Sequence, residues 1–248
     1  MPKIGSQHGH SLVEVVIVIV ILGVISVIAV VSLRSSGETA RVERTKQKLD
    51  RLAKAIAGDP ALVSSGVRTD YGYVGDIGAL PSNMDVLGSN SLGYATWQGP
   101  YIFDEISEGG AADDYQRDAW GVQITRAGTL LISGGSGSNL SRPIANSVDD
   151  LLYNRVSVVV TDLNGTPPGE TYNDSLLIVL DHPNGGGGVS MRQTNPAPDG
   201  MAEFDSIPIG LHRLRLVYLP DNDTLESRVA VNPGDHAYAE THWWQDLW

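Results

Sequence analysis

The hydrophobic pattern at the start of the chain predicts one long helix. From Ser11 to Leu33 almost every position is apolar, and Glu14 is the only charged residue. At ~1.5 Å of rise per residue, a helix over this run is long enough to cross a bilayer core of about 30 Å. A buried carboxylate costs roughly 2.5–3.5 kcal/mol at mid-membrane and less near an edge. Glu14 therefore needs a compensating partner.

After Leu33 the pattern becomes amphipathic. Val42, Leu49, Leu52 and Ile56 recur at helical spacing among basic residues, which predicts one apolar stripe that packs on a globular head. No proline occurs between Pro2 and Pro60, so the helix is expected to continue from the apolar run into this stalk. The Gly-Asp-Pro sequence at 58–60 predicts its end.

The remaining chain alternates short apolar pieces with turns. Residues 61–150 are rich in Gly, Ser and Asp, which predicts short strands and loops, including a strand at 129–133. From Arg155 the spacing of apolar pieces predicts an antiparallel β-sandwich. Its expected strands are 156–160, 176–180, 201–207, 211–218, 229–231 and 237–241. The expected fold class is α+β: a long N-terminal transmembrane and stalk helix packed on a small antiparallel-sheet head, followed by a β-sandwich domain.

Charge and composition restrict the function. The 248 residues carry a formal charge of −12, and residues 60–248 hold nine Lys and Arg against twenty-four Asp and Glu. An acidic soluble part argues against nucleic acid as the main ligand, because phosphate binding needs clustered cations. The absence of cysteine excludes disulfides, zinc–thiolate sites and thiol catalysis. No nucleophile–base motif such as G-x-S-x-G is present, so we expect a protein that is not an enzyme.

The N-terminal motif G-H-S-L-V-E-V-V-I-V-I-V-I-L-G, residues 9–23, resembles the class III leader junction of type IV pilins and of the pseudopilins of type II secretion. The resemblance implies cleavage by a prepilin peptidase between Gly9 and His10, N-methylation of His10, and a role for Glu14 in assembly. It also implies a glycine within the span, which Gly23 matches. The chain departs from the family at His10, where Phe or Met is usual, and it lacks a later proline in the span.

Beyond the leader, two further resemblances cover most of the chain. Short pieces of the middle part resemble, in order, the globular head of the major pseudopilin: G-A-L-P at 78–81, W-Q-G-P-Y-I at 97–102, R-D-A-W-G-V-Q-I at 117–124, and S-V-D-D at 147–150. The later sequence G-M-A-E-F-D-S-I-P-I-G-L-H-R-L-R-L, residues 200–216, resembles carboxypeptidase-regulatory or transthyretin-like modules, which normally perform no chemistry.

The pseudopilin resemblance implies a calcium ion in the loop after the last strand of the head. Calcium takes six to eight hard oxygen ligands. The candidates are Ser133, Ser136, Asn139, Asp149 and Asp150, although the aspartate that is usual within the family's Gly-rich turn is absent. The alternative is that no metal binds and that the two aspartates cap a turn or face solvent.

These inferences divide the chain into a leader at 1–9, a transmembrane and stalk helix at 10–58, a pseudopilin-like head at 59–154, and a β-sandwich at 155–248 with a tryptophan-rich tail. The expected function is that of a pilus-like filament subunit, most specifically a type II secretion pseudopilin in the inner membrane with its head in the periplasm. Its partners would be other pilins, the prepilin peptidase and the inner-membrane assembly platform. Two alternatives remain: a type IV or competence pilin for adhesion or DNA uptake, and a membrane-anchored module that binds glycans or proteins.

Overall fold

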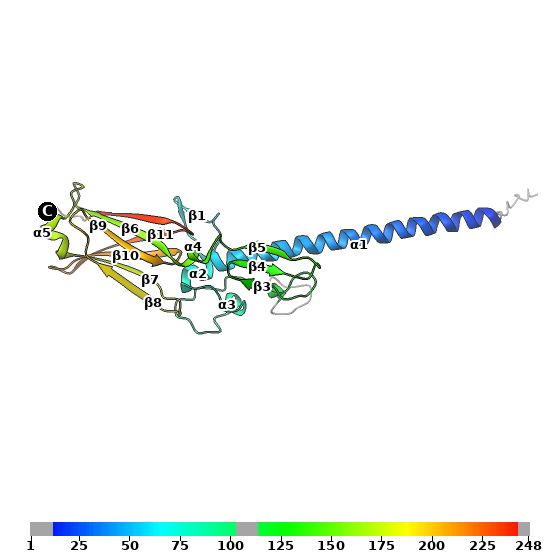
Figure 1. Cartoon of the computed structure of the whole chain (residues 1–248), viewed down its shortest axis with the longest axis horizontal. Coiled ribbons are helices and arrows are strands. Elements are labelled where there is room, and N and C mark those ends of the chain that lie inside the picture. The colour runs from blue at the N-terminus through cyan, green and yellow to red at the C-terminus, as the bar shows by residue number, and fades with distance from the viewer. Residues whose placement is uncertain (1–11, 103–113, 243–248) are drawn as a thin grey trace, which may run out of the picture. The chain divides into compact units, whose positions relative to one another are not determined.

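The computed structural model describes residues 12–102 and 114–242. The predicted leader, Gly9, His10 and the tryptophan-rich tail at 243–248 lie outside the described residues. The chain forms two compact units, and the boundary between them lies between Arg44 and Thr45. Figure 1 follows the elements along the chain by colour.

Helix α1 runs from Leu12 to Ala57, which confirms the predicted continuous helix. Its end is set by Gly58, which adopts a φ of 80° and donates its amide to the carbonyl of Lys54. A positive φ is accessible to glycine at little cost, and it satisfies carbonyls that would otherwise lack partners at a helix C-terminus. The helix therefore ends where the Gly-Asp-Pro sequence predicts.

The head begins with the last three turns of α1. Three of the four predicted stripe residues, Leu49, Leu52 and Ile56, are fully buried in its core, whereas Val42 is only half-buried. Small helices and one antiparallel sheet, in the order β3-β4-β5, complete this core around them. The elements are β1 (Val63–Ser64), β2 (Val67–Arg68), α2 (Gly72–Ile77), α3 (Asp85–Gly88), η1 (Asp114–Gln116), β3 (Thr125–Ala127), β4 (Leu130–Ser133), β5 (Leu140–Pro143) and α4 (Val148–Leu152).

Two sheets make up the C-terminal third, with strand orders β11-β10-β7-β8 and β12-β6-β9. Alternate residues from both sheets, among them Val158, Ile178 and Leu216, form one buried apolar cluster, so the two sheets are packed as a sandwich. The elements are β6 (Asn154–Thr161), α5 (Gly169–Tyr172), η2 (Asn173–Ser175), β7 (Leu176–Pro183), β8 (Val189–Thr194), β9 (Met201–Ile207), β10 (Gly210–Tyr218), β11 (Asp223–Val231) and β12 (His236–His242).

The expectation of an entirely antiparallel sandwich is wrong at one pair. Strand β12 lies parallel to β6, with His236 opposite Arg155 at the start of both strands. The cause is the turn before β12, where Gly234 donates its amide to the carbonyl of Asp150, just ahead of β6. Both strands therefore begin at the same end of the sandwich and run in the same direction.

The head and the sandwich are joined by backbone hydrogen bonds. Gly185 donates to the carbonyl of Ile77 at 2.8 Å, and Ile209 donates to that of Leu151 at 2.9 Å. The Ile209 side chain is fully buried in the core of the head. The predicted domain boundary between residues 154 and 155 stays a prediction. We call the contact surface between the head before it and the sandwich after it the seam.

Gly78 tests how strongly the seam contributes to stability. A Cβ at this position would lie 2.6 Å from the carbonyl oxygen of Pro183, and its φ is 77°. Gly66 has a φ of 82° and open space around its Cβ position. Alanine costs roughly 1–2 kcal/mol at a left-handed residue, and overpacking adds about 1–3 kcal/mol.

We expect G78A to lower the free energy of unfolding by about 2 kcal/mol more than the control G66A, since only G78A adds the overpacking cost. Urea titration of the full chain, followed by tryptophan fluorescence, measures both. Equal losses in the two variants would show that the seam does not constrain Gly78.

Candidate functional site

The N-terminal segment of α1 presents its apolar side chains to solvent. Of its larger residues, Leu12 is 79% exposed and Leu33 is 73% exposed, and those between them for which exposure is given are also exposed. Glu14 lies in the first turn of the helix. By length and composition α1 is able to cross a membrane, and the most apolar window along it has no buried residue. This segment requires a cover of lipid or of other apolar helices.

Gly23 makes this surface locally flat. A Cβ built at Gly23 meets nothing within 4 Å. Small residues allow two helix backbones to approach closely in an apolar environment. The Ser26 hydroxyl, one turn away, is already satisfied because it donates to the carbonyl of Leu22 at 2.7 Å. The segment can therefore meet another helix at Gly23 without leaving this hydroxyl unpaired.

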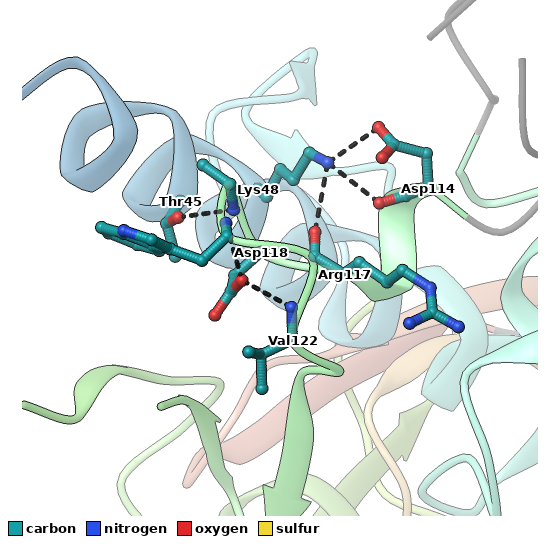
Figure 2. Close-up of polar contacts among 8 residues, drawn as sticks. Thr45, Lys48, Asp114, Arg117, Asp118 and Val122 are labelled. Carbon is teal, nitrogen blue, oxygen red and sulfur yellow. Dashed lines mark hydrogen bonds and ion pairs between the residues drawn. The ribbon is translucent and has the colours of Figure 1, made fainter. Parts of the chain in front are cut away.

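In the head unit, the last turns of α1 are fastened to one loop, as Figure 2 shows. The Lys48 ammonium donates to the carboxylate of Asp114 at 2.8 Å and to the carbonyls of Asp114 and Arg117 at 2.9 and 3.1 Å. The fully buried Thr45 hydroxyl accepts the amide of Ala119 at 3.1 Å. These contacts hold the loop at residues 114–122 to the stalk.

Within this loop, the side chain of Asp118 holds the turn at residues 118–122 in place. Its Oδ1 accepts the amides of Trp120 and Val122, both at 2.9 Å. Its Oδ2 accepts the Ser133 hydroxyl at 2.6 Å and the Gly135 amide at 3.0 Å. The residue is only 3% exposed. Burial raises the pKa of Asp118, but the hydrogen bonds outweigh this effect and hold the pKa below its ordinary value.

The structure divides the five calcium candidates into two groups. Ser133 ends β4 and pairs with Leu140 at the start of β5, and Ser136 and Asn139 lie in the connection between these two strands. The Ser133 hydroxyl is bound to Asp118, and the Ser136 hydroxyl donates to the carbonyl of Ser138.

Asp149 and Asp150 follow the opposite end of β5, in the first turn of α4. The Ser147 hydroxyl accepts the Asp150 amide at 3.0 Å and donates to its carboxylate at 2.8 Å, which is the N-cap arrangement. Within residues 12–102 and 114–242, no group of three or more His, Asp or Glu side chains is arranged to hold a metal ion. Calcium binding by the five candidates stays a prediction.

Comparison with known families decides the nature of the N-terminal segment. Residues 4–30 match the prokaryotic N-terminal methylation motif. This match covers Gly9, His10, Glu14 and Gly23, and it supports a type IV pilin-like subunit with a class III leader. It does not extend to the head or to the sandwich.

The other comparisons add no functional information. No curated protein matches the chain. Two solved structures resemble parts of it: the Bacillus anthracis TIE protein, at 11% identity and a TM-score of 0.28, and S.CueP, at 13% identity and a TM-score of 0.26. The similar regions cover 48% and 47% of this chain, and 23% and 73% of the two proteins respectively. The chain thus matches less than a quarter of the first protein.

Sequence reasoning did not identify Asp118, Lys48 or Thr45 as contributors to the loop. The only local signal for Asp118 is the Asp-Ala-Trp-Gly order at 118–121, since aspartate commonly accepts backbone amides two residues further on. Its contacts with Ser133 and Gly135 depend on the fold.

The four hydrogen bonds to Asp118 predict a pH-dependent contribution to stability. With its folded pKa below the ordinary value, the carboxylate stabilises the head above the unfolded pKa, and this stability is lost as the pH falls through the folded pKa. D118N removes the charge and places an amide group against donors, which we expect to cost about 1–3 kcal/mol near neutral pH.

Urea titrations between pH 7 and pH 2.5 measure this effect. We expect the difference between wild type and D118N to shrink in acid. The control D221N changes an exposed aspartate in the turn between β10 and β11 and should leave the pH profile unchanged. A D118N profile parallel to that of wild type over the whole range would contradict the assignment.

Proposed function

We propose that this chain is a structural subunit of a pilus-like filament, most specifically a type II secretion pseudopilin, and that it is not an enzyme. The observation that supports this proposal is the exposed apolar segment from Leu12 to Leu33, most of which lies in the matched N-terminal methylation motif at residues 4–30. Such a surface is covered by lipid while the subunit is a membrane protein. In a filament it is covered by the same segment of other subunits.

Cleavage between Gly9 and His10 creates a positively charged amine four residues before Glu14. In a filament, the Glu14 carboxylate of one subunit pairs with the amine of its neighbour, which offsets the cost of removing both charges from water. This pair also selects one axial register, because a shifted neighbour leaves a carboxylate buried without a counter-charge. Glu14 is thus the residue that sets subunit spacing, and Gly23 is the residue that allows close helix contact.

The assignment to type II secretion rests on the head. Its pieces resemble the major pseudopilin in order, from the stalk to Asp150. In this proposal the subunit lies in the inner membrane with its head in the periplasm, where the prepilin peptidase processes it and the assembly platform adds it to the filament. A calcium ion held by Ser133, Ser136, Asn139, Asp149 or Asp150 would be structural.

The methylation motif is also compatible with a surface or competence pilus, since it describes the leader and the helix alone. The surplus of acidic residues after Pro60 disfavours direct DNA binding in that case. An anchored binding protein is the other alternative. Processing at Gly9 distinguishes it from the filament subunits.

We expect prepilin peptidase to release residues 1–9, so that intact mass spectrometry finds a chain that begins at His10. G9V places a branched side chain at the cleavage site and should leave the leader attached in at least about nine-tenths of the chains, an effect of about 1.4 kcal/mol or more on the processing step. G5V, within the same leader, should be processed like the natural chain. A natural chain that keeps its leader in cells with active peptidase would contradict the pilin assignment.

We expect E14Q to be processed normally but to assemble at least about tenfold less filament, because the neighbour's amine then lacks its counter-charge. E38Q, on the same helix beyond the apolar run, is the control and should assemble like wild type. Quantitative immunoblots of sheared filaments and of total membranes measure both steps. Wild-type amounts of E14Q filament would disprove the role of Glu14.

A further inference from the structure

A cavity of about 490 Å³ lies at the seam between the head and the sandwich. Its walls include Asp76 from α2, and Gln98 and Tyr101 from the loop after α3. On the sandwich side they include Leu211 from β10 and Arg228 from β11. Small-molecule sites commonly have volumes of about 300–1,000 Å³ and occur at the junctions between domains. Neither the assembly helix nor the predicted calcium residues contribute to this cavity.

The polar groups on one wall are fixed in position. The Tyr101 hydroxyl donates to the Asp76 carboxylate at 2.6 Å and accepts a hydrogen bond from the backbone N–H of Gln98 at 3.1 Å. The Tyr101 ring lies edge-to-face between Tyr73 and Trp97, with ring centroids 5.7 and 5.6 Å apart. A rigid wall binds a ligand with a smaller entropic cost, because its side chains are already ordered.

A second polar group in the lining, the Thr96 hydroxyl, is not used by the described part of the chain to hold its fold. The Thr96 hydroxyl is buried and has no hydrogen-bond partner within the described part of the chain. Thr96 belongs to the same cavity, although its backbone is held separately, by a hydrogen bond from its amide to the carbonyl of Gly187 at 3.2 Å. An unpaired buried hydroxyl costs about 1–3 kcal/mol, which a bound polar molecule or water would relieve.

The site extends beyond this one cavity. A neighbouring cavity of about 460 Å³ shares Asp70, Gly72 and Tyr101 with it. Gly72 has a φ of 56°, and a Cβ there would lie 2.6 Å from the carbonyl of Ala55, so the shared wall cannot carry a larger residue without rearrangement. Two adjoining cavities fit a ligand of several linked units better than one compact molecule.

The charges of the lining favour a neutral ligand. Asp70 and Asp76 oppose an anion, and Arg228 opposes a cation. In the neighbouring cavity, Asp59 lies with the cations Arg51 and Lys54, so neither sign of charge prevails there either. Hydroxyl groups suit this mixture, because each donates to a carboxylate and accepts from a guanidinium or an amide. We propose that the seam cavity and its neighbour together bind a neutral oligosaccharide of two to four sugar units. This inference goes beyond the filament role.

The experiment is saturation-transfer NMR on the full chain in a detergent without a sugar headgroup. The probes are cellotriose, maltotriose and chitotriose, with trilysine and tri-galacturonic acid as charged competitors. We expect saturation transfer to at least one neutral probe, and no displacement of it by either charged competitor. No transfer to any neutral probe, or displacement by a charged competitor, overturns the proposal.

Two variants locate the site. R228A and Q98A should weaken binding of the neutral probe at least about tenfold, because each removes hydrogen-bond donors from the lining. R192A removes an exposed arginine of β8 that does not line the cavity, and binding should stay within about twofold of wild type. Urea titration checks that all three fold equally well. Equal affinities of R228A and R192A in folded protein would overturn the assignment of the site.

Discussion

The main physical constraint on this protein is that the apolar side chains of α1 between Leu12 and Leu33 must be shielded from water. Residues 12–33 bury none of their larger side chains for which exposure is given, although a single buried aliphatic side chain of this size is worth about 1.5–3 kcal/mol. Lipid covers such a helix without specificity. The Glu14 carboxylate distinguishes between lipid and a second protein, because a partner that places a positive charge beside it offsets the cost of removing the carboxylate from water. In the proposed filament, the one charged residue of the segment would therefore select both the partner and its register.

The head is held together without disulfide bonds, since the chain has no cysteine. Lys48 and Thr45 attach the loop at 114–122 to the stalk, and Asp118 holds that loop against the connection between β4 and β5. Further along the chain, the amides of Gly185 and Ile209 join the sandwich to the head.

Much of the fold could be predicted from periodicity. The stripe of Leu49, Leu52 and Ile56 identified the buried face of α1, and strand β9 lies where apolar alternation placed it. Strand β8 escaped notice because it is an edge strand whose Val189 and Met191 are exposed, so it has no apolar face to detect. Strand β11 is longer than predicted for the same reason, since its first residues are mostly polar and exposed.

The candidate sites also differ in whether a local sequence pattern reveals them. Glu14 could be proposed from sequence because a charge inside an apolar run is unusual, and the motif at residues 4–30 includes it, but its role stays a prediction. The role of Asp118 could not be found, because its partners Ser133 and Gly135 are distant in sequence. The seam cavity could not be found from sequence either, since its lining comes from α2, two loop segments and strands β7, β8, β10 and β11, which approach one another only in the folded chain.

The central claim is that copies of the apolar segment cover one another after processing. The absence of cysteine makes a direct measurement possible, because each single cysteine introduced between Val15 and Val31 is unique in the chain. Oxidative cross-linking in cells should give covalent dimers that recur with helical periodicity along the segment and disappear when the prepilin peptidase is absent. Cross-linking that is uniform along the segment, or unaffected by loss of the peptidase, would contradict this account.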